Sequence, residues 1–474
     1  MNFICSKSEP EHLGFVLGVA SAVLGAWGVP PALGDLDGAN FAASLTSFDP
    51  LHQSPHFPGY PVFVGLARLA ALGTKSEVWS LVLPALVLWP FALALLAGAL
   101  GRATGAATGL CATAVLAFSP GVIQLLGWPG SDGLGVVILV AGAALTLRAG
   151  SSPTLVPWVG VAFALLLGVR LSWWPLLVLP AAFLGRAGMR AVPAFLVVTM
   201  SWVIAVVVAA GPAAVTGLAA SFVAGHFTTF GGTALSDPRS FSDRVATLSL
   251  SVLESGLGLT LIPALVILPL LLLGIRVDRG ARPSKLTLST LLAGGVYSGW
   301  VLFAQNVDRP RHAIPIVLML ALGLASLANL RTAFTVRLAL FGLALVGVVA
   351  SGPRLDRQGA RPAPLARLAE RLTHLGAPDK VMLFAGDEAR LVERLAPGYR
   401  VLRPRDRAVL DAEAQRLSGM GIVVYVSSRA IADSAADPAL SKVEEFRELA
   451  VLRGPDANVA LFRFEPPRFA EVTP

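Results

Sequence analysis

The chain has 474 residues, of which 55% are hydrophobic and 14% are charged, and its mean hydropathy is +0.71. So many long uncharged segments exclude an ordinary soluble globular protein. Basic residues exceed acidic ones and give a net charge of +8. In a membrane protein such an excess is explained by basic cytoplasmic loops, so no nucleic-acid partner is predicted. With only two cysteines, neither a disulfide framework nor a metal cluster is predicted.

Apolar segments of membrane length follow one another from the N-terminus to about Ser351. A helix needs about 20 mostly apolar residues to cross a bilayer, and we expect a polytopic, mainly α-helical bundle of about eleven spans. They are placed at Leu13–Val29, Val78–Leu100, Thr108–Leu125, Gly133–Leu147, Leu155–Val169, Trp173–Leu184, Ala191–Ala210, Gly256–Ile275, Leu286–Ala304, Ala313–Leu327 and Arg337–Ser351. The first has no A-x-A cleavage pattern and is interpreted as an uncleaved span. Trp173–Leu184 is short and contains two prolines, so a tilted, broken or re-entrant segment is expected.

The first long polar interruption, from Gly34 to Pro61, follows directly on the first apolar run. It places Asp35 and Asp37 just past the expected membrane surface, after the rigid Pro30-Pro31 pair. Carboxylates are costly near hydrocarbon, so their presence there indicates a functional site. A solvated connecting loop is the alternative interpretation.

The charges of the loops predict the topology. One set of loops is almost purely basic, with Arg102, Arg148, Arg186, Arg190, Arg276, Arg279, Arg282, Lys285 and Arg331. The other set is rich in aspartate, with Asp35, Asp37, Asp49, Asp132, Asp237, Asp243 and Asp308. Basic loops belong in the cytoplasm, so the aspartate-rich loops and everything after Ser351 are expected outside. The protein is therefore predicted in the plasma (inner) membrane, with a cytoplasmic N-terminus.

The last part of the chain changes character, and we expect two domains, 1–351 in the membrane and 352–474 outside it. Charges become frequent after Gly352, and short strand-like runs alternate with helical ones. Strands are expected at Lys380–Ala385, Gly421–Val426 and Ala457–Phe464, and a helix at Asp387–Leu395. This pattern predicts a small outward-facing α/β domain. Gly386-Asp387-Glu388 after the first strand is interpreted as a structural turn rather than a nucleotide site.

An outward-facing site built from these loops would contain mostly Asp, Arg and His. Asp37 is a candidate general base for an acceptor hydroxyl or amine. Arg170, Arg309 and Arg311 lie near the expected outer surface and have forked donors suited to a phosphate. For Arg170, which interrupts an apolar stretch, the alternative is a side chain that extends to the lipid headgroups. For Arg309 and Arg311 the alternative is pairing with Asp308 or with lipid phosphate.

Two histidines are further candidates for donor binding. His56 lies among prolines beside Tyr60, and His226 is expected in a long outer loop between two spans. An incidental loop histidine is the alternative for each. The sequence contains no H-x-x-x-H metal spacing, no G-x-S-x-G and no phosphate-binding loop motif, which removes the commoner hydrolase and ATPase interpretations.

The first loop resembles that of the GT-C class of membrane glycosyltransferases, which includes protein O-mannosyltransferases and lipid A aminoarabinose transferases. Asp37-Gly38-Ala39-Asn40-Phe41 matches the family's Asp and following aromatic, and 52–61 resembles its His-Pro-Pro-Gly-Tyr-Pro motif. Ser131-Asp132-Gly133-Leu134 and Arg311-His312-Ala313-Ile314-Pro315 resemble further family positions. Two departures are Gly38 in place of the second acid and Phe57 in place of the first proline.

The resemblance implies an inverting glycosyltransferase that takes its sugar from a polyprenyl-phosphate donor, with Asp37 as the base. Asp35, His56, Arg170, His226, Arg309 and Arg311 are then expected to bind the donor, and the acceptor is a glycolipid, a glycan or a protein. No cofactor is expected, although the missing second acid leaves the question of a divalent metal open. The alternatives are a polytopic transporter, a lipid-linked-oligosaccharide ligase or polymerase, and a non-catalytic membrane subunit.

Overall fold

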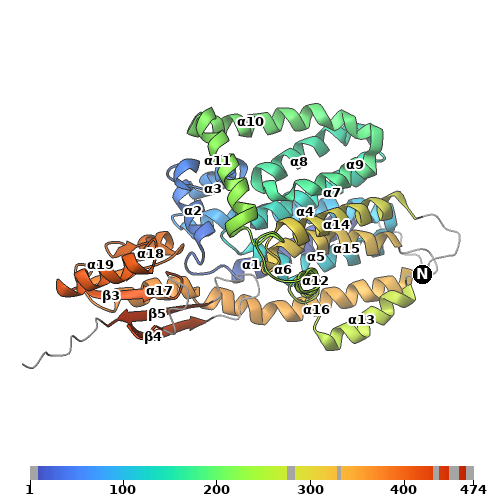
Figure 1. The fold of residues 1–474 in the computed structure, drawn as a ribbon. Coiled ribbons are helices and arrows are strands. Elements are labelled where there is room, and N and C mark those ends of the chain that lie inside the picture. Colours follow the sequence, from blue (N-terminus) through green and yellow to red (C-terminus); the bar gives the residue numbers. More distant parts are fainter. Residues whose placement is uncertain (1–8, 275–282, 328–332, 431–436, 448–457, 466–474) are drawn as a thin grey trace, which may run out of the picture. The chain divides into compact units, whose positions relative to one another are not determined.

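The computed structural model describes residues 9–274, 283–327, 333–430, 437–447 and 458–465 (Figure 1). Arg276, Arg279, Arg282 and Arg331 of the predicted cytoplasmic loops lie outside these ranges, as does Ile275 at the end of a predicted span. The chain divides into two compact units, described separately below. We call Met1–Val29 with Phe41–Gly359 the membrane unit, and Pro30–Asn40 with Ala360–Pro474 the C-terminal unit. The loop that carries Asp35 and Asp37 therefore belongs to the C-terminal unit.

The membrane unit is built from helices. They are α1 Glu9–Trp27, α2 Leu36–Ser44 (whose first five residues belong to the other unit), α3 Pro61–Ala71, α4 Glu77–Thr104, α5 Ala106–Ala117, α6 Pro120–Leu126, α7 Ser131–Ala149, α8 Val156–Val169, α9 Val178–Leu184, α10 Val192–Ala210, α11 Pro212–Gly225, α12 Phe241–Leu250, α13 Leu261–Gly274, α14 Lys285–Ala304, α15 Ile314–Leu327 and α16 Ala333–Ala360. Short 3-10 turns cover Pro50–His52, Pro153–Leu155, Leu171–Leu177, Gly185–Ala191 and Pro310–Ala313. π-helical turns cover His226–Phe230 and Ser251–Gly256.

Helix α4 lies at the centre of the membrane unit, in contact with α1, α3, α5 and α7. Its N-terminus is capped by Ser76, whose hydroxyl accepts from the Trp79 amide. The side chain of Trp89 is fully buried, and its indole N–H donates to the Ser21 hydroxyl of α1 at 2.8 Å. Gly14 and Gly18 of α1 lie directly against α4, where a β-carbon would approach Ala97 and Pro90 within 2.6 Å. Small residues thus let the two helices pack closely, as is usual in membranes.

In the described part of the chain, seven helices are long and apolar enough to cross a membrane, or up to nine if two bent pairs each form one span. Two of the eleven expected spans are not among these candidates: Leu13–Val29 corresponds to α1, which is not counted, and Leu155–Val169 corresponds to a shorter apolar helix, Pro153–Val169. The other differences lie between Leu171 and Phe230. Trp173–Leu184 and Ala191–Ala210 merge into one apolar run of 40 residues, Leu171–Ala210. Residues 212–225, expected in an outer loop, form the additional helix α11. The uncharged, Ala-rich stretch between Pro212 and His226 favours this helix.

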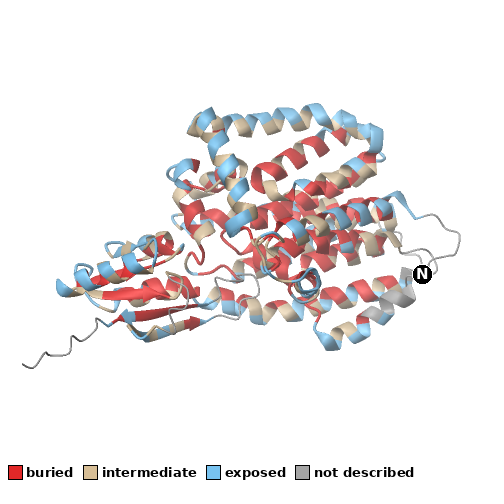
Figure 2. Cartoon of the chain, in the orientation of Figure 1, coloured by how far each residue is buried: buried red, intermediate tan, exposed pale blue. Residues whose placement is uncertain are grey.

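Helices α10 and α11 cover little of the core. Only Val206 is buried on α10, and no residue of α11 is buried. Figure 2 shows both helices mostly in the colours of exposed and intermediate residues, whereas α4 and α7 are largely buried. In a bilayer, exposed Val, Leu and Ile side chains face lipid rather than water. These properties make the chain an integral membrane protein.

The C-terminal unit contains a five-stranded sheet with the order β2-β1-β3-β5-β4. Its elements are α17 Pro364–Thr373, β1 Val381–Phe384, α18 Ala389–Leu395, β2 Arg400–Leu402, α19 Arg407–Gly419, β3 Val423–Ser427, β4 Leu440–Arg447 and β5 Asn458–Phe464. Strand β1 is parallel to β2 and β3, and β5 is antiparallel to β3 and β4. The predicted strands are found as β1, β3 and β5 and the predicted helix as α18, while β2, β4, α17 and α19 were not predicted.

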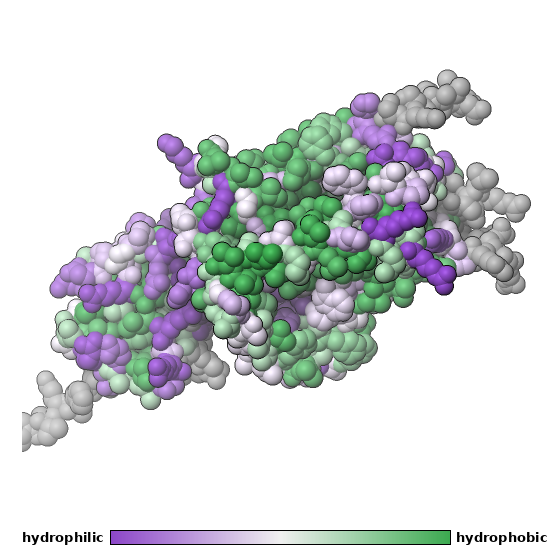
Figure 3. All heavy atoms as spheres, turned by 90° about the horizontal axis from the view of Figure 1, so that it is seen from above, coloured by the Kyte–Doolittle hydropathy of each residue, from purple (hydrophilic) through white to green (hydrophobic). Residues whose placement is uncertain are grey.

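Apolar side chains of the sheet and of α19 form the core of this unit. Met382 and Phe384 of β1 pack with Leu410 and Leu417 of α19. Helix α17 lies along β4, where Arg371 pairs with Glu444 at 3.0 Å. In Figure 3, hydrophobic residues cover much of the membrane unit, and hydrophilic residues are frequent on the C-terminal unit. The C-terminal unit thus has the composition and core of a water-exposed α/β domain, as predicted.

Candidate active site

A buried cluster of three charged side chains lies inside the membrane unit. The Arg170 Nε is 3.1 Å from the Asp132 Oδ1, with the geometry of an ion pair rather than of a linear hydrogen bond. The Arg311 Nη1 is 3.5 Å from the other oxygen of Asp132. The three side chains are only 2–14% exposed. One carboxylate is therefore shared by two guanidinium groups. We call the three side chains the Asp132 cluster.

The three residues come from separate breaks between helices. Asp132 lies in the first turn of α7, where the helix dipole favours a negative charge. Arg170 directly follows α8, and the 3-10 turn after it directs the chain away from the helix axis. Its guanidinium also donates to the Ser131 hydroxyl at 3.4 Å. With 6% exposure, Arg170 faces the interior and does not extend to the lipid headgroups.

Buried polar groups surround the cluster. The Tyr297 hydroxyl, the Trp173 indole nitrogen and the His312 Nδ1 have no hydrogen-bond partner within the described residues. Tyr297 lies within electrostatic reach of Arg170 and Asp132. His312 lies within electrostatic reach of four groups, namely Arg170, Arg309, Arg311 and His226. The Trp173 ring packs on α7, where a β-carbon at Gly135 would lie 3.0 Å from it. A buried polar group without a partner costs about 1–3 kcal/mol, so this site is suited to a polar ligand or to water.

A second network holds the loop that carries Arg309 and Arg311. Arg244 is 1% exposed and donates to Asp237, to the carbonyls of Leu302 and Gln305 at 2.8 Å, and to that of Gly232 at 3.2 Å. Arg239 bridges Asp237 and Asp308 with short hydrogen bonds to both carboxylates. The bond from Arg239 holds the pKa of Asp237 well below its usual range, so that carboxylate stays charged. The loop before α15 is thereby fixed to the end of α14.

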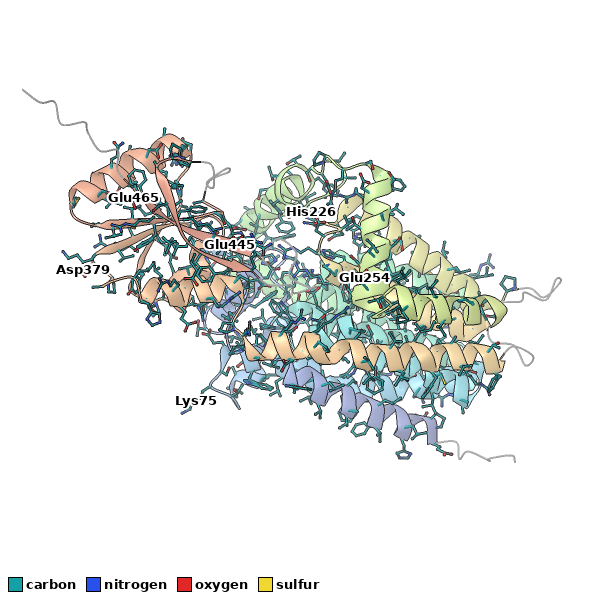
Figure 4. All side chains as sticks on the ribbon, turned by 90° about the horizontal axis from the view of Figure 1, so that it is seen from below. Lys75, His226, Glu254, Asp379, Glu445 and Glu465 are labelled. Atoms are coloured by element: carbon teal, nitrogen blue, oxygen red, sulfur yellow. The ribbon has the colours of Figure 1, made fainter. Side chains whose placement is uncertain are left out.

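The two candidate histidines lie on either side of one phenylalanine. The His56 and Phe222 rings are stacked with their centroids 6.4 Å apart, and the Phe222 and His226 rings are stacked at 6.2 Å. The His56 Nε2 is 3.0 Å from the Tyr60 hydroxyl. The His226 Nε2 is 2.8 Å from the Ala304 carbonyl, which can only accept, so this nitrogen carries the hydrogen. His226 lies in the π-helical turn where α11 ends, not in the predicted loop (Figure 4).

The predicted aspartates lie in the C-terminal unit. The side chain of Asp35 accepts a hydrogen bond from the Gly38 amide at 2.7 Å and so caps the N-terminus of α2. Asp37 is half-buried in the first turn of that helix. One turn later, the Asn40 Oδ1 accepts from the Arg390 Nη1 at 3.2 Å. Asp35 therefore has a structural task on the helix that carries Asp37.

The predicted site residues thus form three groups. Arg170 and Arg311 meet at Asp132, with Arg309 nearby, and His56 and His226 flank Phe222. Asp37 lies in the first turn of α2 and Asp35 caps that turn, both in the C-terminal unit, so their approach to the arginines stays a prediction. The motifs place Asp132 and His312 at family positions without giving them a role, and nothing in the sequence indicated Tyr297 or Trp173. The signal for Asp132 was a lone carboxylate at the start of an apolar span. No three His, Cys, Asp or Glu side chains of the described ranges are placed to hold a metal ion.

The search of solved structures found membrane glycosyltransferases. ArnT from Cupriavidus metallidurans bound to undecaprenyl phosphate matches with a TM-score of 0.57 and 13% identity, over 94% of this chain and 97% of that one. Its apo form matches with a TM-score of 0.56. The oligosaccharyltransferase of Archaeoglobus fulgidus in complex with zinc and sulfate matches with a TM-score of 0.50 and 13% identity, over 88% of this chain and 67% of that one.

The chain has the GT-C fold. This confirms the fold that the first loop predicted, although no protein-family model and no curated protein sequence matches the chain. The similarity extends over almost the whole of ArnT, so it includes the part that forms the C-terminal unit here. Likeness at 13% identity establishes architecture, and the chemistry must be argued from the side chains.

Proposed function

We propose that this protein is a glycosyltransferase that transfers a sugar from a polyprenyl-phosphate donor to an acceptor on the outer face of the membrane. The observation that carries the proposal is the Asp132 cluster, in which two largely buried arginines meet at one carboxylate inside a membrane unit with the GT-C fold. A donor of this kind has a tail that partitions into lipid and a head that carries negative charge. ArnT of the same fold binds undecaprenyl phosphate, which supports this class of lipid.

The two guanidinium groups of the cluster suit an anionic ligand. Taking two guanidinium groups out of water in one place carries a desolvation cost. A phosphate oxygen near Arg170 and Arg311 offsets that cost, and the planar forks of arginine suit phosphate geometry. Tyr297, Trp173 and the ring nitrogen of His312 offer further hydrogen-bonding groups at the same place.

The proposed reaction needs a base and a site for the leaving phosphate. The Asp37 carboxylate removes the proton of the acceptor hydroxyl or amine. The acceptor atom then forms a bond to the anomeric carbon as the bond from that carbon to the phosphate oxygen breaks. The configuration inverts, and the proton remains on Asp37. The leaving group changes from a phosphodiester to a phosphomonoester and gains negative charge, which Arg170 and Arg311 stabilise.

The other predicted residues have supporting tasks in this proposal. Arg309 adds positive charge beside Arg311, and His56 and His226 line the donor site together with Phe222. Asp35 acts by capping α2 rather than by contacting the sugar. The acceptor is a glycolipid, a glycan or a protein. A ligase or polymerase that uses a lipid-linked oligosaccharide shares the same donor chemistry and is distinguished only by the size of the transferred group.

Binding and transfer of defined lipids test the proposal. The purified protein in lipid nanodiscs is expected to bind undecaprenyl phosphate and to be stabilised against heat by it, because a ligand that binds only the folded state raises its stability. Undecaprenol, which lacks the phosphate, should have little effect. Cells with the gene should carry a sugar on envelope glycolipids or glycoproteins that is absent without it, as measured by mass spectrometry. Equal binding of both lipids, or unchanged glycans together with transport of a solute, would contradict the proposal.

The proposed topology can be tested separately. Because the basic loops favour the cytoplasm, the N-terminus is expected inside and the C-terminal unit outside, in the periplasm if the cell has an outer membrane. A phosphatase that is active only outside the cytoplasm should therefore be active when fused after residue 359 and inactive when fused after Arg148. An inactive first fusion together with an active second one would reverse the proposed orientation.

A further inference from the structure

The helix that carries Asp37 is attached to the C-terminal domain by a buried polar contact. Asn40 is 1% exposed, and its side-chain oxygen accepts from the Arg390 guanidinium at 3.2 Å. The two residues are 350 positions apart in the chain and belong to the same compact unit. The Asn40 acceptor is shielded from water and Arg390 is half-buried, and a hydrogen bond from a charged donor is stronger than one between neutral groups.

Arg390 itself is held by the turn between β1 and α18. It is the second residue of α18, which directly follows Gly386-Asp387-Glu388, the segment interpreted from the sequence as a structural turn. Glu388 is fully buried, and its carboxyl group accepts from the Ser427 hydroxyl at the end of β3. The turn packs so closely that a β-carbon at Gly386 would lie 2.2 Å from the Arg429 carbonyl oxygen. The sheet therefore determines where the Arg390 backbone lies.

Asn40 lies three residues after Asp37 on α2. Residues at this spacing are neighbours on the same side of a helix. Asp35 caps the first turn through the Gly38 amide, and Arg390 holds the next turn through Asn40. The short segment that presents Asp37 is thus restrained at two points, one from its own loop and one from the C-terminal domain.

We propose that Arg390 is a positioning residue that orients Asp37 by holding the Asn40 side chain. The inference rests on the proposed function, in which Asp37 is the base. It gives the C-terminal domain a direct task in catalysis, because its parallel strands hold the arginine that restrains the catalytic helix. Loss of the contact leaves the carboxylate in place but lets it sample unproductive orientations. Small displacements of a reacting group reduce rates by up to about 100-fold.

Two measurements on the full-length protein test this contact: amide hydrogen exchange and the kinetics of sugar transfer. Arg390→Ala is expected to accelerate amide exchange in residues 36–44 and to lower kcat about 10- to 100-fold, while the affinity for undecaprenyl phosphate is unchanged. Asn40→Leu should have the same effect. Asn40→Asp keeps an acceptor for Arg390 and should remain near the wild type. The double variant Arg390→Ala, Asn40→Leu should be no worse than either single variant, because both remove one contact.

Arg416→Ala is the matched control, since Arg416 is an exposed arginine of the same domain that pairs with Glu413 on its own helix. It should leave both readouts unchanged. If Arg390→Ala also accelerates exchange in β1 and β3, that substitution disturbs the sheet itself. The Asn40 variants then test the contact, because Asn40 lies outside the sheet. Normal kcat or normal exchange in Asn40→Leu overturns the inference. Failure of the proposed function is distinct, because the wild type itself would then transfer no sugar.

Discussion

Replacing Asp37 with asparagine is expected to lower the rate of sugar transfer about 10²–10⁴-fold, the usual effect of losing a general base. Asparagine keeps the size and the hydrogen-bonding capacity of the side chain but cannot accept the acceptor's proton. The affinity for undecaprenyl phosphate should not change, because the lipid phosphate is assigned to arginines of the other unit. The measurement is kcat with a purified polyprenyl-phosphate sugar, beside a binding curve for the lipid. A kcat within about threefold of wild type would remove Asp37 as the base.

Asp35→Asn provides the matched control for this experiment. The Asp35 side chain accepts a hydrogen bond from the Gly38 amide at the start of α2, and asparagine is as good an N-cap as aspartate. This variant removes the same charge two residues earlier and should retain most of the activity. A large loss in Asp35→Asn with little loss in Asp37→Asn would exchange the two assignments.

Replacing Arg170 with alanine is expected to weaken binding of undecaprenyl phosphate by about 2–5 kcal/mol, which is roughly 30-fold or more in Kd. The substitution removes a phosphate contact and also reduces the compensation of the buried Asp132 carboxylate. Arg170→Lys keeps the charge but not the planar fork, so it should bind more weakly than wild type and more tightly than alanine. The measurement is lipid binding to protein in nanodiscs, with undecaprenol as the uncharged comparison.

Arg244→Ala separates a loss of binding from a loss of folding. Arg244 is another buried arginine of the membrane unit, with a carboxylate and three backbone carbonyls as partners, but it lies outside the Asp132 cluster. Removing it should lower thermal stability strongly, because Asp237 loses a buried partner. The fraction that remains folded should bind the lipid far better than Arg170→Ala does. Equal lipid affinity in wild type and Arg170→Ala would exclude Arg170 from the donor site.

The sequence predicted the membrane body and the α/β domain because both depend on patterns that extend over many residues. Uncharged runs of span length and alternating strand-like runs are such patterns. Helix α11 was not predicted, although Pro212 is well tolerated in the first turn of a helix and the residues after it are uncharged and Ala-rich. Arg170 was placed near the surface with its side chain undecided between the interior and the headgroups. Only the break after α8 shows that it turns inward.

The partners of the charged residues could not be read from the sequence. Asp132 and Arg311 are separated by almost 180 positions, and nothing local to either one indicates the other. The same is true of Asn40 and Arg390, whose contact depends on the way α18 follows the sheet. Motifs identified candidate residues such as Asp37, whereas pairings between distant breaks in helices come only from tertiary packing.

The two outermost strands of the C-terminal sheet bear on how the protein behaves in a crowded envelope. An open strand edge offers unpaired amides and carbonyls to any other sheet it meets. Here β2 has only three residues, and on β4 Lys442 and Arg447 each pair with Glu445 at 2.5 Å. A short edge on one side and a charged edge on the other both disfavour strand addition by a neighbouring copy. Many copies can therefore share one membrane without their sheets joining edge to edge.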